Sequence, residues 1–239
     1  MMIGLIILEM KINCLATGST GNCYLVDTGS GCIILDAGVN LDKIVSNVNL
    51  NDVLFAFISH EHQDHSKSAQ KLATRRVKVL GGNLIHDFVK IANLGRIGAK
   101  FQVFAFPVEH GECNCGGLIV KNIENNECFL YITDFTICKW DLSDIKFTHV
   151  MVECNYCEDF INQVEVEDYK IKRQINTHMG LKGVQVFLDT LDLSMCEEIL
   201  LIHQSQGMGD AITMGSTIYS KYRIKTGVCK QYGGIDYYG

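Results

Sequence analysis

Proline is almost absent from this 239-residue sequence, which contains only Pro107. Glycine, which occurs 22 times, and asparagine must therefore form most of the turns. No low-complexity tract, long linker or internal repeat is visible. A chain of this length can bury one full hydrophobic core, so we expect a single domain.

Positive charge is also scarce. The 21 lysines and arginines are outnumbered by 27 acidic residues, which gives a net charge of −6 and no basic excess of the kind typical of proteins that bind duplex DNA. Three short basic groups, at 71–78, 170–173 and 221–225, are typical of ordinary solvated faces, and contact with a nucleic-acid strand is the less favoured alternative. If nucleic acid is the substrate, something other than overall charge must attract its phosphates.

Long apolar runs are missing as well. Segment 1–12 is apolar but short and has no basic region, so we expect neither a signal peptide nor a membrane span. Since MKINCLATGS reads as a natural start, we treat 1–9 as an N-terminal extension and 10–239 as the domain. The 11 cysteines are scattered and odd in number, which favours reduced thiols and a cytoplasmic protein over a disulfide framework.

Short apolar segments alternate with polar turns. Strands are predicted at 11–16, 23–27, 32–38, 53–59, 78–82, 100–106, 117–122, 129–134, 147–153 and 197–203, and helices at 41–48, 66–76, 86–93 and 180–193. In the last helix Leu181, Val184, Leu188 and Leu191 recur at helical spacing, which predicts a buried face. This alternation predicts an α/β fold with two sheets sandwiched by helices.

One six-residue stretch concentrates metal-binding side chains. The segment HEHQDH follows an apolar predicted strand and carries His60, His62, Asp64 and His65. Residues two apart in an extended chain point the same way, so His60 and His62 can address one point, while Asp64 and His65 on the following turn can address a second. Imidazole and carboxylate groups bind zinc or manganese, and two such ions about 3.5–4 Å apart can clamp a phosphoryl group.

Two metal ions need more ligands than this segment offers. His110, Asp134 and His203 each stand at the end of a predicted strand, where they could complete the site. Taken singly, each could equally be a hydrogen-bonded histidine or a turn-forming aspartate. Only their combination favours a metal site.

The order of these residues resembles the metallo-β-lactamase fold superfamily. HEHQDH matches its H-x-H-x-D-H signature, and His110, Asp134 and His203 match its later motifs. Within the superfamily the sequence is most similar to the YycJ/WalJ-like branch and its phage-borne relatives, which are related to ribonucleases Z and J. The segments that carry this likeness are LATGSTGNCYLV, LDAG, YITD, VECNY, NTHMG and LLIHQS.

The resemblance implies a four-layer αββα sandwich, formed as a single domain, and two divalent ions, Zn²⁺ or Mn²⁺. It implies that the first ion is held by His60, His62 and His110, the second by Asp64, His65 and His203, and that Asp134 bridges the two. It also makes Asp64 a candidate general base for the attacking water. Asp36 is either a partner that fixes a ligand histidine or only a turn residue.

The same resemblance assigns a proton donor. His178 would protonate the leaving oxygen, held in place by Glu153, although a capping role at the next helix is the alternative. His86 and His149 match no motif and are expected to be structural.

The fold hosts several hydrolytic reactions, so the substrate needs a separate argument. Two metals together with a proton donor favour phosphodiesters, and the YycJ/WalJ-like branch implies a nuclease, most simply one acting on DNA. The alternatives are a cyclic-nucleotide phosphodiesterase, a thioester or lactone hydrolase, and a metal-binding protein without catalysis. The branch also allows a homodimer. Gly111 stands where many relatives have aspartate, and QSQGMGD after His203 is looser than usual, so metal preference and substrate fit stay open.

Overall fold

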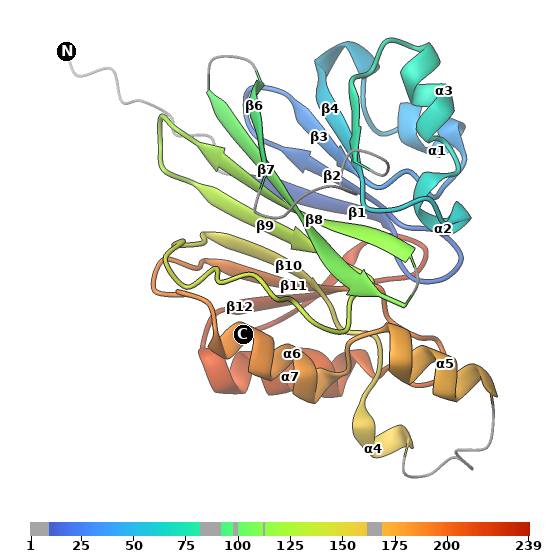
Figure 1. The fold of residues 1–239 in the computed structure, drawn as a ribbon, viewed down its shortest axis with the longest axis vertical. Helices are drawn as coiled ribbons and strands as arrows, with labels where there is room; N and C mark the ends of the chain where they lie inside the picture. Colours follow the sequence, from blue (N-terminus) through green and yellow to red (C-terminus); the bar gives the residue numbers. More distant parts are fainter. Residues whose placement is uncertain (1–9, 82–91, 98–99, 112, 162–168) are drawn as a thin grey trace.

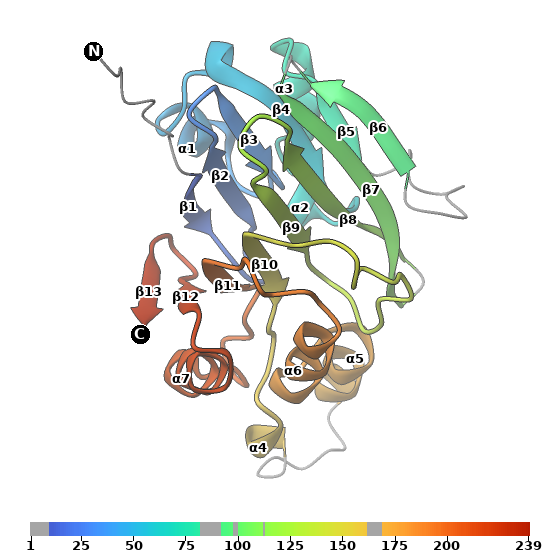
Figure 2. The ribbon, with the colours of Figure 1, turned by 90° about the vertical axis from the view of Figure 1, so that its left-hand side faces the viewer.

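Two β-sheets form the centre of the molecule. The computed structural model describes residues 10–81, 92–97, 100–111, 113–161 and 169–239. In this described part, the first sheet has five strands in chain order: β1 (Lys11–Ala16), β2 (Cys23–Asp27), β3 (Cys32–Leu35), β4 (Val53–Ile58) and β5 (Val79–Gly81). Figures 1 and 2 show this sheet packed against a second, larger one.

The second sheet has eight strands in the order β13-β12-β11-β10-β9-β8-β7-β6 within the described residues. These are β6 (Ala92–Ile97), β7 (Phe101–His110), β8 (Cys113–Asn122), β9 (Cys128–Ile132), β10 (His149–Glu153), β11 (Glu198–Ile202), β12 (Lys225–Cys229) and β13 (Ile235–Tyr238). Strands β9 to β12 are mutually parallel, and β7 runs in the same direction because β8 is antiparallel to both β7 and β9.

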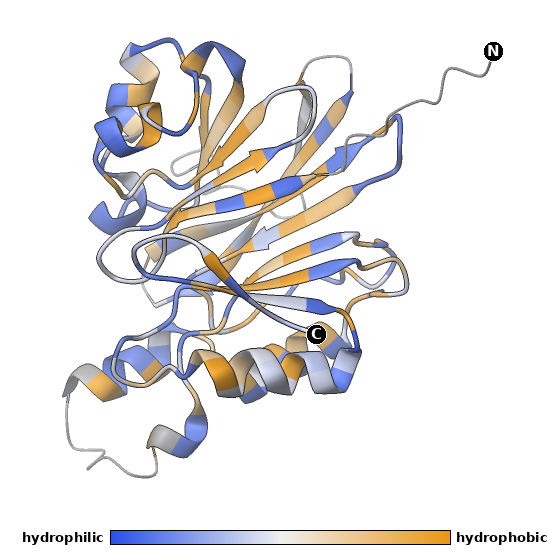
Figure 3. Cartoon of the chain, turned by 180° about the vertical axis from the view of Figure 1, so that it is seen from behind, coloured by the Kyte–Doolittle hydropathy of each residue, from blue (hydrophilic) through white to orange (hydrophobic). Residues whose placement is uncertain are grey.

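A continuous apolar layer separates the two sheets. From the first sheet it includes Tyr24 and Phe57, and from the second Tyr131 and Leu200, all without measurable solvent exposure. The Phe57 ring meets the edge of Tyr131 with centroids 6.4 Å apart, a favourable aromatic arrangement. Figure 3 shows the apolar colouring concentrated on the strands.

Helices cover both outer faces. On the first sheet lie α1 (Leu41–Val45) and α3 (Ala69–Thr74), with α2 (Gln63–Ser66) at its edge; on the second lie α6 (Leu181–Asp189) and α7 (Ala211–Tyr222), with α4 (Glu158–Ile161) and α5 (Tyr169–Thr177) beyond them. The predicted face of α6 is buried, since Val184 and Leu188 contact the second sheet's outer core. The predicted four-layer αββα sandwich is therefore confirmed.

The structure adds elements that the sequence pattern did not predict. Helix α7 and strands β12 and β13 follow β11 and form the C-terminal end of the domain. The helix predicted at 86–93 falls mostly outside the described residues, and its last two positions begin strand β6 instead. The extension predicted at 1–9 also lies outside them. Among the described helices, none combines the length and apolar character needed to cross a membrane.

Candidate metal centre

The carboxyl ends of several strands meet at one edge between the sheets. His60 follows β4, His110 ends β7, Asp134 follows β9, Glu153 ends β10 and His203 follows β11. Because β7, β9, β10 and β11 point the same way, their ends converge on the same edge of the second sheet, opposite the end of β4. Ligand sites form readily at such edges.

The backbone turns sharply just after β3, β9 and β11. Asp36, Asp134 and His203 have φ values of 54°, 47° and 55°, in the left-handed region that non-glycine residues rarely occupy. Such a conformation costs of order 1–3 kcal/mol per residue and persists where the surrounding structure enforces it. Each strained residue aims its side chain at the edge where the strands converge.

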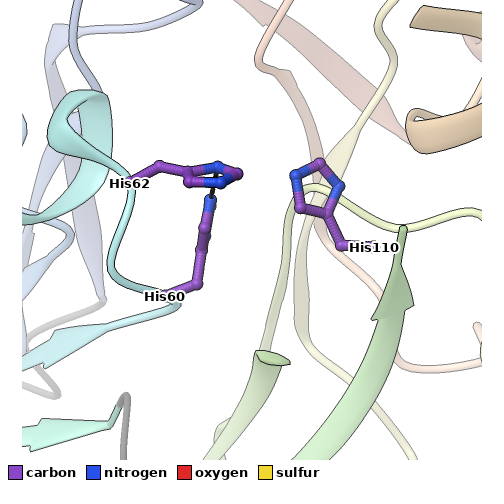
Figure 4. A group of neighbouring side chains, drawn as sticks. All are labelled: His60, His62 and His110. Carbon is purple, nitrogen blue, oxygen red and sulfur yellow. Dashed lines mark hydrogen bonds between the residues drawn. The ribbon is translucent and has the colours of Figure 1, made fainter. Parts of the chain in front are cut away.

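Three histidines form the first group at this edge (Figure 4). Ligand nitrogens of His60, His62 and His110 lie within 4.8 Å of one another. His60 Nε2 is 2.8 Å from His62 Nδ1, and the far nitrogen of His60 contacts Ser59 Oγ at 3.0 Å. His110 donates from Nδ1 to the Thr177 carbonyl at 2.8 Å, which leaves its Nε2 lone pair facing the other two rings.

The second group consists of Asp64, His65 and His203, whose ligand atoms also lie within 4.8 Å of one another. His65 donates from Nδ1 to Asp36 at 2.6 Å, so its Nε2 faces Asp64. His203 Nε2 is buried without a hydrogen-bond partner in the described part of the chain; Asp134 at 3.5 Å and Asp64 at 3.7 Å are the carboxylates nearest to it. A buried nitrogen of this kind needs a ligand of its own.

Asp134 stands between the two groups. Its Oδ1 is 3.4 Å from His65 Nε2 and 3.5 Å from His203 Nε2, whereas its Oδ2 is 3.6 Å from His110 Nε2 and 3.9 Å from His60 Nε2. One oxygen of a single carboxylate therefore faces each histidine set. This is the geometry expected of a group that bridges two cations.

The electrostatics of the cluster suit cations. Burial alone would raise the pKa of Asp134, but the surrounding histidines hold it well below its usual value, so the carboxylate is ionised. Burial would lower the pKa of His203, yet Asp134, Asp64 and Glu153 together raise it to about 10. The negative charge that favours a proton at this imidazole also favours a divalent cation. Desolvation and neighbouring histidines lower the pKa of His60 to about 2, so its ring is neutral and can act as a ligand.

These features fit a metal site of imidazole and carboxylate donors. The described residues also contain a third and a fourth potential ligand group, and both include Asp134. All seven side chains predicted as ligands lie in this one cluster. The donor types suit zinc and manganese alike, so the cluster by itself selects neither.

Asp36 is fully buried and supports the cluster through hydrogen bonds. It accepts hydrogen bonds from His65, from the Ser59 amide and hydroxyl, and from the Tyr131 hydroxyl at 2.5 Å. The contact expected between Asp36 and a ligand histidine is therefore present. Ser59 and Tyr131 were not predicted to take part, because nothing in a serine or a strand tyrosine marks such a role in one sequence.

Glu153 connects His178 with the cluster. It is fully buried, and its Oε1 lies 2.6 Å from His178 Nδ1 and 3.1 Å from His203 Nδ1. Burial would raise the pKa of Glu153, but the neighbouring His178 lowers it, so the carboxylate is ionised and Nδ1 of His178 must donate. The His178 ring stacks on His203 with centroids 5.1 Å apart. His149, by contrast, is buried against Thr148 at the other end of β10, as expected of a structural histidine, and His86 lies outside the described residues.

Two asparagines that the sequence did not single out support the ligands. Asn155 Nδ2 donates to the His203 carbonyl at 2.7 Å and lies 3.2 Å from its ring nitrogen. Asn22 donates from its backbone amide to the Asp64 carbonyl at 2.7 Å. Both belong to segments that carried the family likeness, NCYLV and VECNY, which was the one signal that could have found them.

A cleft of about 800 Å³ opens over the cluster. Its lining includes six side chains of the site, which are His62, Asp64, His110, Asp134, His178 and His203, together with residues of α5 and of the loop after β11. A second cleft of about 870 Å³ borders β1 to β4, but no histidine lines it. The chemistry is therefore concentrated in the first cleft.

This edge site between two helix-covered sheets can be compared with known proteins. The family model described as Metallo-beta-lactamase superfamily matches residues 16–124, which include the first five predicted ligands. The chain has the metallo-β-lactamase fold. The match also supports its place in that superfamily, whereas no curated protein matches the sequence.

Several solved structures match nearly the whole chain. The metallo-beta-lactamase fold protein YhfI from Bacillus subtilis is 15% identical with a TM-score of 0.69, over 96% of this chain and 99% of that one. The short form of human tRNase Z is 11% identical with a TM-score of 0.60, over 94% and 98%. A diphosphatase from the PhnP family is 12% identical with a TM-score of 0.56, over 97% and 98%. At these identities the likeness shows the fold alone.

Proposed function

We propose that this protein is a dinuclear-metal phosphodiesterase that hydrolyses nucleic-acid phosphodiester bonds, most simply as a DNA nuclease. The observation that carries the proposal is the position of Asp134, with one oxygen facing His60 and His110 and the other facing His65 and His203. A bridging carboxylate between two ligand sets suits a pair of ions rather than one.

The ligand assignment follows the two groups. His60, His62 and His110 would hold one ion, Asp64, His65 and His203 the other, and Asp134 would contact both. When bound, two Zn²⁺ or Mn²⁺ ions would lower the pKa of water and neutralise the charge of a phosphoryl group.

The chain's own side chains supply proton transfer and orientation. Asp64 is partly exposed to the cleft, and His65 and His203 hold its pKa low despite burial, so it is ionised and can orient water as a hydrogen-bond acceptor. His178 donates from Nδ1 to Glu153, and its other nitrogen, on a ring that lines the cleft, can pass a proton to the departing oxygen. The hydrogen bond to ionised Glu153 fixes the orientation of that imidazole.

Two of the similar structures support a phosphate-containing substrate over other substrates. One is named a tRNase and another a diphosphatase. A proton donor poised beside the two-metal site is also more useful for an alkoxide leaving group than for the thiolate of a thioester, since a thiolate leaves without protonation.

The test is a substrate panel with zinc- and manganese-loaded protein. It contains single-stranded DNA, duplex DNA, structured RNA, cyclic nucleotides, bis-p-nitrophenyl phosphate, and a thioester and a lactone. We expect cleavage of a polymer, loss of turnover in Asp64→Ala, and a reduced rate of 10²-fold or more with retained metal in His178→Ala.

Other outcomes would redirect the proposal. Turnover of cyclic nucleotides alone would make the protein a cyclic-nucleotide phosphodiesterase, and turnover of the thioester or lactone alone would make it an ester hydrolase. Metal binding without any turnover would point to a non-catalytic metal protein. Full activity in Asp64→Ala would contradict the two-metal assignment. Size-exclusion chromatography with light scattering tests the homodimer that the branch allows.

A further inference from the structure

Helix α5 forms one wall of the cleft over the metal cluster. The residues of α5 that line it are Tyr169, Arg173, Gln174 and Thr177, which we call the α5 wall. Their spacing of four, one and three residues puts them on one side of the helix. In Figure 1, α5 lies on the same side of the molecule as α2, which carries Asp64 and His65.

The C-terminal end of α5 is hydrogen-bonded to residues of the cluster. The Thr177 carbonyl accepts a hydrogen bond from His110 Nδ1 at 2.8 Å. Gln174 donates from Nε2 to Asn155, whose own amide holds His203. The first hydrogen bond reaches the predicted ligand His110, and the second reaches Asn155, which contacts the predicted ligand His203. The rest of α5 extends away from the cluster along the cleft.

The far part of the α5 wall carries an aromatic ring and a positive charge. Tyr169 is 77% exposed although it lines the cleft, which is unusual for a large ring with an apolar body. Arg173 is the one lysine or arginine among the described residues that line this cleft, and its side chain is exposed. The helix contains Lys170, Lys172 and Arg173 and no acidic residue, in a chain whose net charge is −6.

We infer that the α5 wall binds the part of a single-stranded nucleic acid that flanks the scissile bond, with Arg173 on a neighbouring phosphate and Tyr169 stacked on a base. At a rise of 1.5 Å per residue, Arg173 and Tyr169 lie about 6 and 12 Å along the helix from Thr177. At the roughly 3.4 Å rise of a stacked strand, that length covers about three to four nucleotides, and it covers fewer of an extended single strand. A guanidinium suits phosphate, and stacking on an aromatic ring tolerates any base.

This inference rests on the proposed function and makes it more specific. It gives a protein with a net charge of −6 a specific contact for a polyanion, because Arg173 lines the cleft over the cluster. It also separates polymers from small substrates, since a cyclic nucleotide has no flanking phosphate for Arg173 to contact.

The test compares a dinucleotide with a single strand of about ten nucleotides, the size that one strand-binding groove covers. Both DNA and RNA versions of one base sequence are used with manganese-loaded protein. The variants are Tyr169→Ala and Arg173→Gln. Their matched controls are Tyr232→Ala, an 81% exposed tyrosine, and Lys172→Gln, an exposed lysine on α5, neither of which lines the cleft.

We expect the longer strand to have the lower KM in the wild-type protein and in both controls. Tyr169→Ala should raise its KM about tenfold, the effect of losing one stacked base. Arg173→Gln should reduce the slope of log KM against log salt by about 0.7, the contribution of one phosphate contact on a single strand. A larger effect on DNA or on RNA would identify the preferred strand.

The inference is overturned if Tyr169→Ala and Arg173→Gln match their controls on the longer strand while the wild-type protein cleaves it. If the wild-type protein hydrolyses no phosphodiester, the proposed function fails separately. Binding of the fluorescently labelled longer strand, measured by anisotropy with the same four variants, then decides whether the α5 wall holds a strand.

Discussion

At the scale of single residues, the site depends on side chains held by several partners at once. Asp36 accepts four hydrogen bonds, from His65, Tyr131 and two groups of Ser59. Glu153 accepts from two histidine rings through one oxygen and from the Phe135 and Met179 amides through the other. Several hydrogen bonds to one buried carboxylate hold the donating rings in one orientation.

Substitution of Asp36 should therefore leave the ligand His65 in place but make its ring less well ordered. We expect Asp36→Ala to reduce metal affinity about 10–100-fold, because the His65 ring loses the acceptor that fixes its orientation. Affinity can be measured by competition with a coloured chelator. Asp42→Ala, an exposed aspartate on α1, is the control and should bind metal as the wild type does. Equal affinity in Asp36→Ala and the control would show that the hydrogen bond does not support the site.

At the scale of elements, the segment 60–66, here called the Asp64 loop although it contains the short helix α2, is docked on the loop before β2 and on the turn after β3. Backbone hydrogen bonds join Asn22 to Asp64 at 2.7 Å and Ala37 to His65 at 2.7 Å. Gly38 lies so close that a Cβ atom there would fall 1.7 Å from the Asp64 carbonyl oxygen. The glycine of the LDAG segment thus permits contact between two loops, a reason that its sequence alone does not reveal.

We expect Gly38→Ala to displace the Asp64 loop and lower both metal content and turnover, because no rotamer can relieve a clash between a Cβ atom and backbone. Metal content by elemental analysis and the melting temperature are the measurements. Gly207→Ala, where an added Cβ meets open space, is the control and should keep its metal. Wild-type metal content in Gly38→Ala would mean that the two loops are free to separate.

The elements also show where sequence patterns were sufficient. Helix α6 was predicted correctly because its leucines and valine recur at helical spacing on a buried face. Helix α7 was missed, since AITMGSTIYSKY mixes glycine, serine, threonine and isoleucine, which do not favour a helix on their own. Its formation depends on Met214 and Ile218 packing against the second sheet.

At the scale of the whole molecule, the candidate metal centre joins the two sheets. Its ligands come from both, with His60, His62, Asp64 and His65 on the first and His110, Asp134 and His203 on the second. Bound ions would therefore connect the two halves of the sandwich and stabilise the folded state.

Removal of the metal should accordingly destabilise the entire domain. At a metal concentration about 1,000 times Kd, binding contributes about 4 kcal/mol, and its loss lowers Tm by about 10 °C for a chain of this size. Calorimetry with and without a chelator measures the shift, and metal added back in excess of the chelator should restore Tm. An unchanged Tm in a protein shown to have lost its metal would contradict a centre that joins the sheets.

The sequence by itself determined the local parts of this protein: the HEHQDH ligands after a buried strand, the alternation of strands and helices, and a set of ordered motifs that implied the fold. Local spacing is enough for these because neighbouring residues are held together by the chain. The tertiary structure decided which oxygen of Asp134 faces which histidines, which donors converge on Asp36 and Glu153, and that the basic helix α5 borders the cleft. These relations join residues far apart in the chain, and only the packing of the two sheets brings them within a few ångströms.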